Sequence, residues 1–288
     1  MFIFKTINDI QAYLRKSTQN GEKVGFTPTM GALHSGHLSL ISRAKEENVF
    51  SVCSIFVNPT QFNDPKDLEK YPRPIEQDIQ LLISAGCDIL FLPDVAEMYP
   101  PGLDVSVKVN LGGLDQVLEG PKRPGHFDGM VTIVHRLLDI VQPDKLYMGL
   151  KDYQQQAIIG QMIADLQMPI ELIPCESIRE ADGLAMSSRN ARLSPEWRAK
   201  APLIYQELNT VAGRLDLESI SSVEASITYS LSAAGFKVEY ISIVDAGTLQ
   251  EISSLSSNQN WVALVAVWAG DVRLIDNIAG QSKFSDLS

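Results

Sequence analysis

Two histidines in a glycine-containing segment are the first residues whose spacing suggests a reaction. The segment PTMGALHSGH, residues 28–37, carries His34 and His37 three positions apart, which places both side chains on one face of a helical first turn. A helix N-terminus offers unpaired N–H groups with a partial positive charge, and Gly31 and Gly36 let a ligand approach the backbone closely. These features predict a phosphate-binding site.

The same histidine pair has two other interpretations. A His-x-x-His pair is half of a zinc site, but zinc needs further ligands, and the remaining histidines, His126 and His135, are distant in sequence. Alternatively, the two imidazoles simply satisfy polar groups at the start of a helix. The glycines around the pair and its position after a predicted strand favour phosphate binding.

A second polar segment, NPTQFN at residues 58–63, follows an apolar run rich in Val, Ile and Phe. Its Asn-Pro start is typical of an ordinary turn. Gln61, however, combines a neutral donor and acceptor, which suits the binding of a substrate hydroxyl or carboxylate without added charge. Both interpretations remain open from spacing alone.

A third segment, MGLKDYQQ at residues 148–155, also runs from a predicted strand into a helix. Lys151 is either a solvated surface charge or a point charge for phosphate. Asp152 is equally compatible with a helix N-cap. The segment therefore predicts a strand-end loop and only suggests a ligand contact.

Two further segments contain cations. Residues 178–190, IREADGLAMSSRN, place Ser187, Ser188 and Arg189 where they form either a phosphate clamp or a capped turn. The basic stretch KRPGH at residues 122–126 is a weaker candidate, because exposed loops commonly carry such charges.

The elements that position these segments alternate between β-rich runs and amphipathic stretches, which predicts a parallel sheet with helices on its faces. The predicted strands are Val24–Thr27, Val49–Val57, Asp88–Leu92, Lys145–Met148 and Ile170–Pro174. The predicted helices are Leu38–Glu46, Ile75–Ala85, Gly129–Val141 and Tyr153–Leu166. The fold class is thus α/β, a Rossmann-like doubly wound sheet whose ligands bind beyond the carboxyl ends of the strands. The alternating run Val105–Val109 suggests an accessory edge strand or hairpin.

A change in element order predicts a second, smaller α+β domain. Helical stretches Glu196–Ala212 and Ser219–Ala234 precede two strands, Val238–Val244 and Trp261–Trp268. We place the domains at residues 1–178 and 179–288 and expect the second to close over the site.

Composition excludes several classes of protein. The formal net charge of −11 argues against nucleic-acid binding, which depends on Lys and Arg neutralising phosphates. The longest apolar run, Trp261–Ala269, is too short to span a membrane. The first five residues lack the features of a secretory signal, so we expect a cytosolic protein. Cys53, Cys87 and Cys175 are widely spaced and odd in number, which favours reduced packing residues.

Longer motifs carry a family resemblance. The HSGH segment together with a serine-arginine loop resembles the nucleotidyltransferase superfamily and class I aminoacyl-tRNA synthetases. In chain order, PTMGALHSGHLSLI, FVNPTQFN, RPGHFDGMVTIV, KDYQQ and READGLAMSSRN resemble the pantothenate synthetase (pantoate–beta-alanine ligase) family over about residues 23–193. The remaining chain fits that family's C-terminal domain in length and element order.

This resemblance implies an enzyme that joins pantoate to β-alanine through a pantoyl-adenylate and releases AMP and diphosphate. It also implies magnesium and a homodimer. The implied catalytic residues are His34, His37, Lys151 and Arg189, with His37 as proton donor. The implied ATP-binding residues are Met30, Gly31, Ala32, Leu33, His34, Ser35, Gly36, His37, Gly149, Leu150, Lys151, Asp152, Ile178, Met186, Ser187, Ser188 and Arg189.

The implied substrate contacts are Gln61 and Gln155 for pantoate, with Gln61 also near β-alanine and Asn58, Arg123 and His126 near the pocket. One position departs from the family pattern, because Leu150 gives GLKD where the family carries GEKD. A backbone contact in that loop would survive this change.

Overall fold

The computed structural model describes residues 1–19, 21–62 and 65–282, which form two compact units. The first unit contains residues 1–115, 119–150 and 155–176. Of the described residues, the second contains 116–118, 151–154 and 177–282. Most of each unit is thus a continuous stretch of chain, and two short segments of the N-terminal half belong to the second unit.

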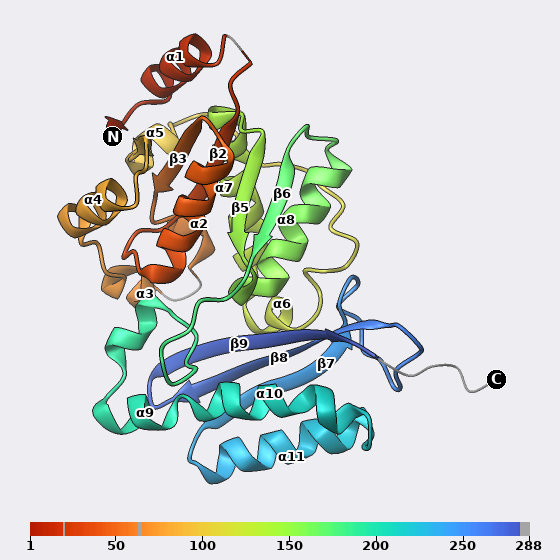
Figure 1. The fold of residues 1–288 in the computed structure, drawn as a ribbon. Helices are drawn as coiled ribbons and strands as arrows, with labels where there is room; N and C mark the ends of the chain where they lie inside the picture. Colours follow the sequence, from red (N-terminus) through yellow and green to blue (C-terminus); the bar gives the residue numbers. More distant parts are fainter. Residues whose placement is uncertain (20, 63–64, 283–288) are drawn as a thin grey trace. The chain divides into compact units, whose positions relative to one another are not determined.

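A six-stranded parallel sheet forms the centre of the first unit (Figure 1). Its strands are β1 (Phe2–Phe4), β2 (Val24–Thr29), β3 (Phe50–Ile55), β4 (Ile89–Phe91), β5 (Lys145–Gly149) and β6 (Glu171–Cys175), in the order β1-β4-β3-β2-β5-β6. Strand β2 pairs in parallel with β3 on one side, Val24 opposite Phe50, and with β5 on the other, Gly25 opposite Lys145. The chain order changes direction between β2 and β5, so the switch point of the sheet lies between these two strands.

Helices connect the strands of this sheet. They are α1 (Ile7–Ser17), α2 (Ser35–Glu47), α3 (Pro65–Lys70), α4 (Ile75–Ser84), α5 (Val95–Met98), α6 (Glu119–Lys122), α7 (His126–Val141) and α8 (Tyr153–Asp165), with 3₁₀ turns η1 (Pro59–Gln61) and η2 (Leu150–Asp152). The crossovers from β1 to β2 and from β2 to β3 run in opposite directions along the sheet, so right-handed connections place α1 and α2 on opposite faces. Accordingly, α2 contacts α4 and α1 contacts α7. Both faces of the sheet are covered, as continuous apolar strands require.

The five predicted strands of this sheet are all present, with small shifts at their ends. Strand β3 is buried from Ser51 to Ile55, which explains its unbroken β-rich sequence. The three-residue strand β1 at the sheet edge and the helix α1 after it were missing from the sequence-based prediction. The predicted α/β class is confirmed.

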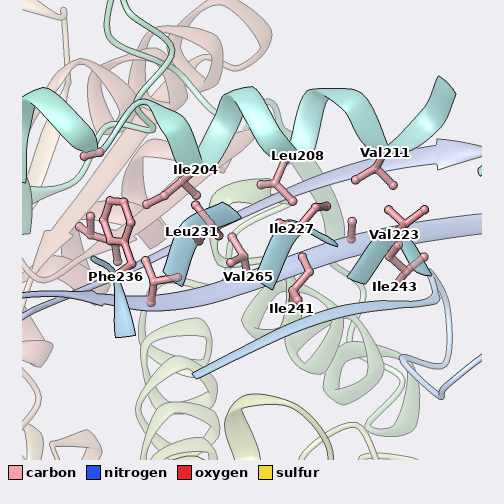
Figure 2. Packing of buried hydrophobic residues seen from close by; sticks show 14 of the residues in the cluster. Ile204, Leu208, Val211, Val223, Ile227, Leu231, Phe236, Ile241, Ile243 and Val265 are labelled. Atoms are coloured by element: carbon pink, nitrogen blue, oxygen red, sulfur yellow. The ribbon is translucent and has the colours of Figure 1, made fainter. Parts of the chain in front are cut away.

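The second unit is a three-stranded antiparallel sheet with helices on one face. Its elements are η3 (Ser188–Arg192), α9 (Pro195–Lys200), α10 (Leu203–Leu215), α11 (Ile220–Ala233), β7 (Lys237–Asp245), β8 (Asn260–Ala269) and β9 (Val272–Gln281). Figure 2 shows Leu208 of α10, Ile227 of α11 and Val265 of β8 meeting in a common core. Burial of these aliphatic side chains stabilises the unit.

Two predicted elements were wrong. Residues 105–109 form no strand, and the backbone N–H of Ser106 donates to the side chain of Asp104, at Oδ1, 2.9 Å away, instead of to a neighbouring strand. The single predicted helix Glu196–Ala212 is two helices, α9 and α10. Pro202 lies between them, and a proline ring is incompatible with a continuous helix.

The three cysteines are free thiols and all are buried, as the sequence predicted. Burial raises the pKa of the Cys87 thiol to about 11, so this group stays protonated at neutral pH. Among the helices in the described ranges, none combines the length and the apolar character that a membrane crossing needs.

Candidate active site

The segment between β2 and α2 is held in shape by one buried carboxylate. Asp78 of α4 is fully buried, and it accepts hydrogen bonds from Ala32 N at 2.9 Å and Leu33 N at 2.8 Å. Gly31 and Ala32 have φ angles of 78° and 51°, the left-handed region that an L-residue rarely adopts. Asp78 therefore stabilises a turn that the sequence alone would not favour.

Glycine is required at position 31 for a second reason. A Cβ there would meet Asp78 Oδ2 and a methyl group of Ile55, each at 2.9 Å. Thr29 Oγ1 accepts a hydrogen bond from Gly31 N at 3.1 Å and donates to Ser54 O at 2.8 Å. Burial raises the pKa of the Asp78 carboxyl, and the hydrogen bonds from Leu33 and Ala32 oppose that shift.

The two histidines meet at the N-terminus of α2. His34 is the N-cap, and its Nδ1 accepts from Gly36 N at 3.2 Å, while His37 Nδ1 accepts from His34 N at 3.4 Å. Their ring centroids are 4.0 Å apart. Because Nδ1 is an acceptor in both rings, the neutral tautomer carries its proton on Nε2, which makes each Nε2–H a donor. The pair thus caps the helix and remains chemically suited to phosphate oxygens.

This helix start lies beside the switch point of the sheet. Met30–His37 follows β2, and Gly149 and Leu150 end β5 and begin the next turn. Strands β2 and β5 are paired neighbours, so their carboxyl ends lie at the same edge. Ligands of open parallel sheets bind at this position. The segments that follow β2 and β5 therefore begin at the same edge of the sheet, and their sharing of one ligand site stays a prediction.

A hydrogen-bonded network fixes the turn after β3. Asn58 Nδ2 donates to Gln61 Oε1 and to Gly129 O, both at 3.1 Å, and Gln61 Nε2 contacts Met30 Sδ at 3.2 Å. His126, the first residue of α7, bonds through Nδ1 to Gln61 O at 2.8 Å. The structure therefore brings Asn58, Gln61, His126 and Met30 together. Asn63, the last residue of this motif, lies outside the described residues.

The other predicted residues of the first unit lie at element ends. Gln155 is half-buried in the first turn of α8. Arg123 precedes α7, and its Nη1 lies 3.9 Å from Glu119 Oε2. Ser35 and Gly36 form the first turn of α2. These positions all lie at or just before the start of a helix.

In the second unit, Lys151 and Asp152 are neighbours in the turn η2. Lys151 Nζ lies 3.9 Å from Asp152 Oδ1, and the side chains are 19% and 51% exposed. The backbone carbonyl of Lys151 accepts from Asn277 Nδ2 at 2.9 Å. The lysine is therefore largely covered, which argues against a simple solvated surface charge.

The serine-arginine loop is a hairpin followed by a capped turn. Met186 N donates to Ile178 O at 3.0 Å, and Arg179 and Ala185 form an antiparallel bridge. Ser187 Oγ then accepts from Arg189 N at 3.3 Å and caps η3, whose first residue is Ser188. The capped-turn interpretation of this sequence is correct, and it leaves the proposed phosphate role of Ser187, Ser188 and Arg189 open.

Metal-ligating side chains do not cluster in the described part of the chain. Across residues 1–19, 21–62 and 65–282, no group of three or more His, Cys, Asp or Glu residues is arranged to hold a metal ion. The His34–His37 pair therefore gains no third ligand there, which a zinc site would require.

Sequence reasoning missed several residues that shape the site. Asp78 lies on the apolar face of the predicted helix Ile75–Ala85, and its role was not predicted. An acidic residue at a core-facing position could have indicated a buried carboxylate with specific partners. Tyr99 donates to Asn58 Oδ1 at 2.7 Å, and it lies outside all the motifs of the sequence. Gly129 is needed because a Cβ there would meet Thr60 O at 2.5 Å, so α7 packs directly on the turn of Gln61.

The fold and the strand-end segments define a class of protein. A doubly wound parallel sheet with a glycine-containing helix start beside its switch point is typical of Rossmann-like nucleotide-binding proteins.

Comparison with known proteins identifies the family. A family model described as Pantoate-beta-alanine ligase matches residues 2–279. Pantothenate synthetases from Cytophaga hutchinsonii and Bacteroides fragilis strain YCH46 are 44% and 45% identical; each alignment covers 96% of this chain and 99% or 98% of the relative. This chain belongs to the pantoate–beta-alanine ligase family of enzymes, which confirms the resemblance seen in its motifs.

Solved structures support the same assignment. Pantothenate synthetase from Thermus thermophilus superposes with a TM-score of 0.88 at 43% identity, covering 96% of this chain and 99% of that one. Pantoate-beta-alanine ligase from Francisella tularensis, described as complexed with "Beta-gamma ATP" and beta-alanine, gives a TM-score of 0.81 at 39% identity, covering 96% and 97%.

Proposed function

We propose that this enzyme ligates (R)-pantoate and β-alanine at the expense of ATP through a pantoyl-adenylate. The observation that carries this proposal is the His34–His37 pair at the N-terminus of α2, beside the β2–β5 switch point. The family membership and the Francisella relative's ligands, an ATP compound and beta-alanine, support it.

In the first proposed step, a carboxylate oxygen of pantoate attacks the α-phosphorus of ATP. A P–O bond forms to the carboxylate as the bond to the bridging oxygen breaks, and diphosphate leaves with its electron pair. Pantoate is already an anion at neutral pH, so this step needs no base. It does need donors for the charge on the phosphoryl oxygens.

The proposed donors are residues with fixed geometry. The N-terminus of α2 contributes backbone N–H groups and a partial positive charge. His34 and His37 contribute Nε2–H groups, because their Nδ1 atoms accept backbone hydrogen bonds. We assign Lys151, Ser187 and Arg189 as further phosphate contacts, with Gly149, Leu150, Asp152, Ile178, Met186 and Ser188 completing the nucleotide site. The second domain, residues 179–288, would close over it.

We assign pantoate to the polar network after β3. Asn58 occupies the oxygen of the Gln61 amide, so the ligand contact in this proposal is the N–H₂ group, of which one N–H points to Met30 Sδ and the second suits a carboxylate or hydroxyl oxygen. Gln155 is the second pantoate contact in this proposal. His126 holds the Gln61 backbone, and Arg123 precedes the same helix.

In the second proposed step, the β-alanine amine attacks the carbonyl carbon of the mixed anhydride. The C–N bond forms, the C–O bond to phosphate breaks, AMP leaves, and the amine gives up a proton. Magnesium would enter as MgATP, since Mg²⁺ is commonly bound through substrate phosphates and water with few protein ligands. We also propose that the enzyme is cytosolic and works as a homodimer.

Product analysis tests the proposed reaction. The protein is incubated with ATP, Mg²⁺ and pantoate, with and without β-alanine, and the products are identified by mass spectrometry. We expect pantothenate, AMP and diphosphate when both substrates are present, and a pantoyl-adenylate with pantoate alone. ADP and phosphate would disprove the adenylate route. A stable dinucleotide would instead indicate a related transferase. The absence of any turnover would indicate a catalytically silent nucleotide-binding regulator.

A further inference from the structure

Strand β9 carries a polar pair inside an otherwise apolar part of the second unit. Asp276 and Asn277 are only 5% and 7% exposed. Successive residues of a strand point to opposite faces. Asp276 shares its face with Val272 and Leu274, both members of the hydrophobic core, so a carboxylate lies at the edge of that core.

Asp276 holds the base of the serine-arginine hairpin. Its two carboxylate oxygens accept from Arg179 Nη1 at 2.6 Å and from Nη2 at 3.0 Å. Such a bidentate pair fixes the plane of the guanidinium as well as its position. Asp276 Oδ1 also accepts from Asn277 N at 2.8 Å, which fixes the carboxylate itself.

Arg179 also contacts the turn of the hairpin and the helix α10. Its Nη1 donates to Gly183 O at 3.2 Å, across the turn that precedes Ala185 and Met186. The guanidinium carbon lies 3.7 Å from the centroid of the Tyr205 ring on α10. Gly183 packs so closely on Tyr205 that a Cβ would lie 2.7 Å from Cδ1. The hairpin leading to Ser187 is therefore locked to β9 and α10.

Asn277 holds the other segment. Its Nδ2 donates to Lys151 O at 2.9 Å, while its own carbonyl accepts from Arg179 Nη2 at 3.4 Å. One pair of neighbouring residues thus contacts both the Lys151 segment and the residue that anchors the hairpin. A buried ion pair gives little net stability compared with an apolar replacement, so the contacts of this pair with two separate segments point to a positioning role.

We infer that Asp276 and Asn277 are positioning residues that couple the Lys151 segment to the Ser187–Arg189 segment, so that the two nucleotide contacts are placed together. Neither residue touches substrate in this scheme. The inference deepens the proposed function, because it assumes that both segments contact ATP.

The kinetic test compares Asp276→Asn and Asn277→Ala with the wild-type enzyme. We expect at least a tenfold loss in kcat/KM for ATP in each variant and a KM for pantoate within twofold of wild type. The double variant should lose less than the product of the single losses, because both residues act on the same linkage. The control is Glu239→Gln, which removes the ion pair of Glu239 on β7 with Arg273 on β9, and whose ATP parameters should not change. The two arginines are equally exposed at 17%, and the Glu239 carboxylate is 21% exposed against 4% for Asp276.

Folded variants with unchanged ATP parameters would overturn the inference. So would equal losses toward ATP and pantoate, or the same loss in Glu239→Gln, since these indicate a merely structural role. If Asp276→Asn fails to fold, the milder Asn277→Ala decides the question.

Hydrogen exchange separates this inference from the proposed function, because it requires no turnover. In Asn277→Ala, coupling predicts faster amide exchange in residues 177–190 as well as in the segment around Lys151, but not in Glu239→Gln. Faster exchange around Lys151 alone would refute the coupling even in an active enzyme. If the wild type forms no pantothenate, the proposed reaction fails, and this exchange pattern still decides whether the two segments are linked.

Discussion

Asn58 Nδ2 donates to Gln61 Oε1 at 3.1 Å and so determines which end of the Gln61 amide is available to a ligand. The orientation of Asn58 is set in turn by its Oδ1, which accepts from Tyr99 OH at 2.7 Å and from Thr60 Oγ1 at 3.1 Å. A hydroxyl outside every motif therefore orients the proposed pantoate contact through a chain of two hydrogen bonds.

Tyr99→Phe tests this relay. Removal of the hydroxyl takes one donor from Asn58 and loosens the Gln61 amide, and a net hydrogen bond is worth about 0.5–1.5 kcal/mol. We expect KM for pantoate to rise roughly threefold to tenfold, with KM for ATP unchanged, in steady-state kinetics with each substrate varied. Tyr13→Phe, a hydroxyl removal on α1 away from the network, is the control. A parallel rise in both KM values would contradict the relay.

Asp78→Asn tests the support of the His34–His37 segment. The asparagine amide has the same shape as the carboxylate, but its N–H₂ group faces one of the two backbone donors, Ala32 N or Leu33 N. That donor then has no acceptor on residue 78. We expect a loss of about 1–3 kcal/mol in the free energy of unfolding, measured by urea denaturation. Because the helix start would lose its fixed geometry, kcat should fall as well. An active variant with wild-type stability would show that Asp78 is dispensable.

The sequence was sufficient to predict the parallel sheet because strands such as β3 are buried on both faces and read as apolar runs. The placement of His34 and His37 at a helix start could also be predicted, since its geometry lies within one short segment, and their phosphate role stays a prediction. Positions that depend on distant partners could not. Asp78 contacts Ala32 and Leu33 across more than forty residues of chain. Only the folded structure shows that an acid in the apolar stripe of a helix stabilises a left-handed turn.

Strand β9 illustrates a second limit of sequence reasoning. Asp276 and Asn277 interrupt the alternation that identifies a strand, so the segment was not predicted. The same two residues, which make the strand hard to recognise in the sequence, form the hydrogen bonds to Arg179 and to the carbonyl of Lys151. In this part of β9, tertiary hydrogen bonds determine the structure more than the local preference of the residues for a strand does.

Glu47 provides a test of stability against pH. Hydrogen bonds from Arg43, Lys145 and Tyr147 lower the pKa of Glu47 from its ordinary value of 4.5 to about 2. A lowered pKa means that the stabilising effect is present above pH 4.5 and is lost as the pH falls toward 2. We expect Glu47→Gln to be less stable than wild type at pH 6, with the difference shrinking between pH 4.5 and 2. Urea denaturation across this range measures it, and a difference independent of pH would refute the assignment.

Lys151→Ala tests the proposed phosphate contact after β5. Loss of a single preorganised donor to a transition state costs roughly 2.7–4 kcal/mol in other enzymes, equivalent to about 10²–10³ in kcat. We expect a loss of that size in steady-state turnover, with Asp152→Asn less affected because its side chain is half-exposed. The carbonyl that Asn277 holds is retained in Lys151→Ala, so the backbone of the segment should stay in place. A kcat near that of wild type would remove Lys151 from the reaction.

His37→Ala distinguishes the two chemical steps. His37 Nδ1 accepts from His34 N at 3.4 Å, so the neutral ring carries its proton on Nε2, and we assign this N–H as a donor to phosphoryl oxygens in adenylate formation. The second step develops charge at the carbonyl of the anhydride, so the variant should slow adenylate formation more than amide formation, as measured by rapid quench. Ser39→Ala removes a neighbouring hydrogen bond to Gly36 O and controls for disturbance of the helix start. His37→Gln, which can restore an N–H donor, should recover part of the first-step rate. A larger effect on amide formation, or an equal loss in Ser39→Ala, would exclude His37 from the first step.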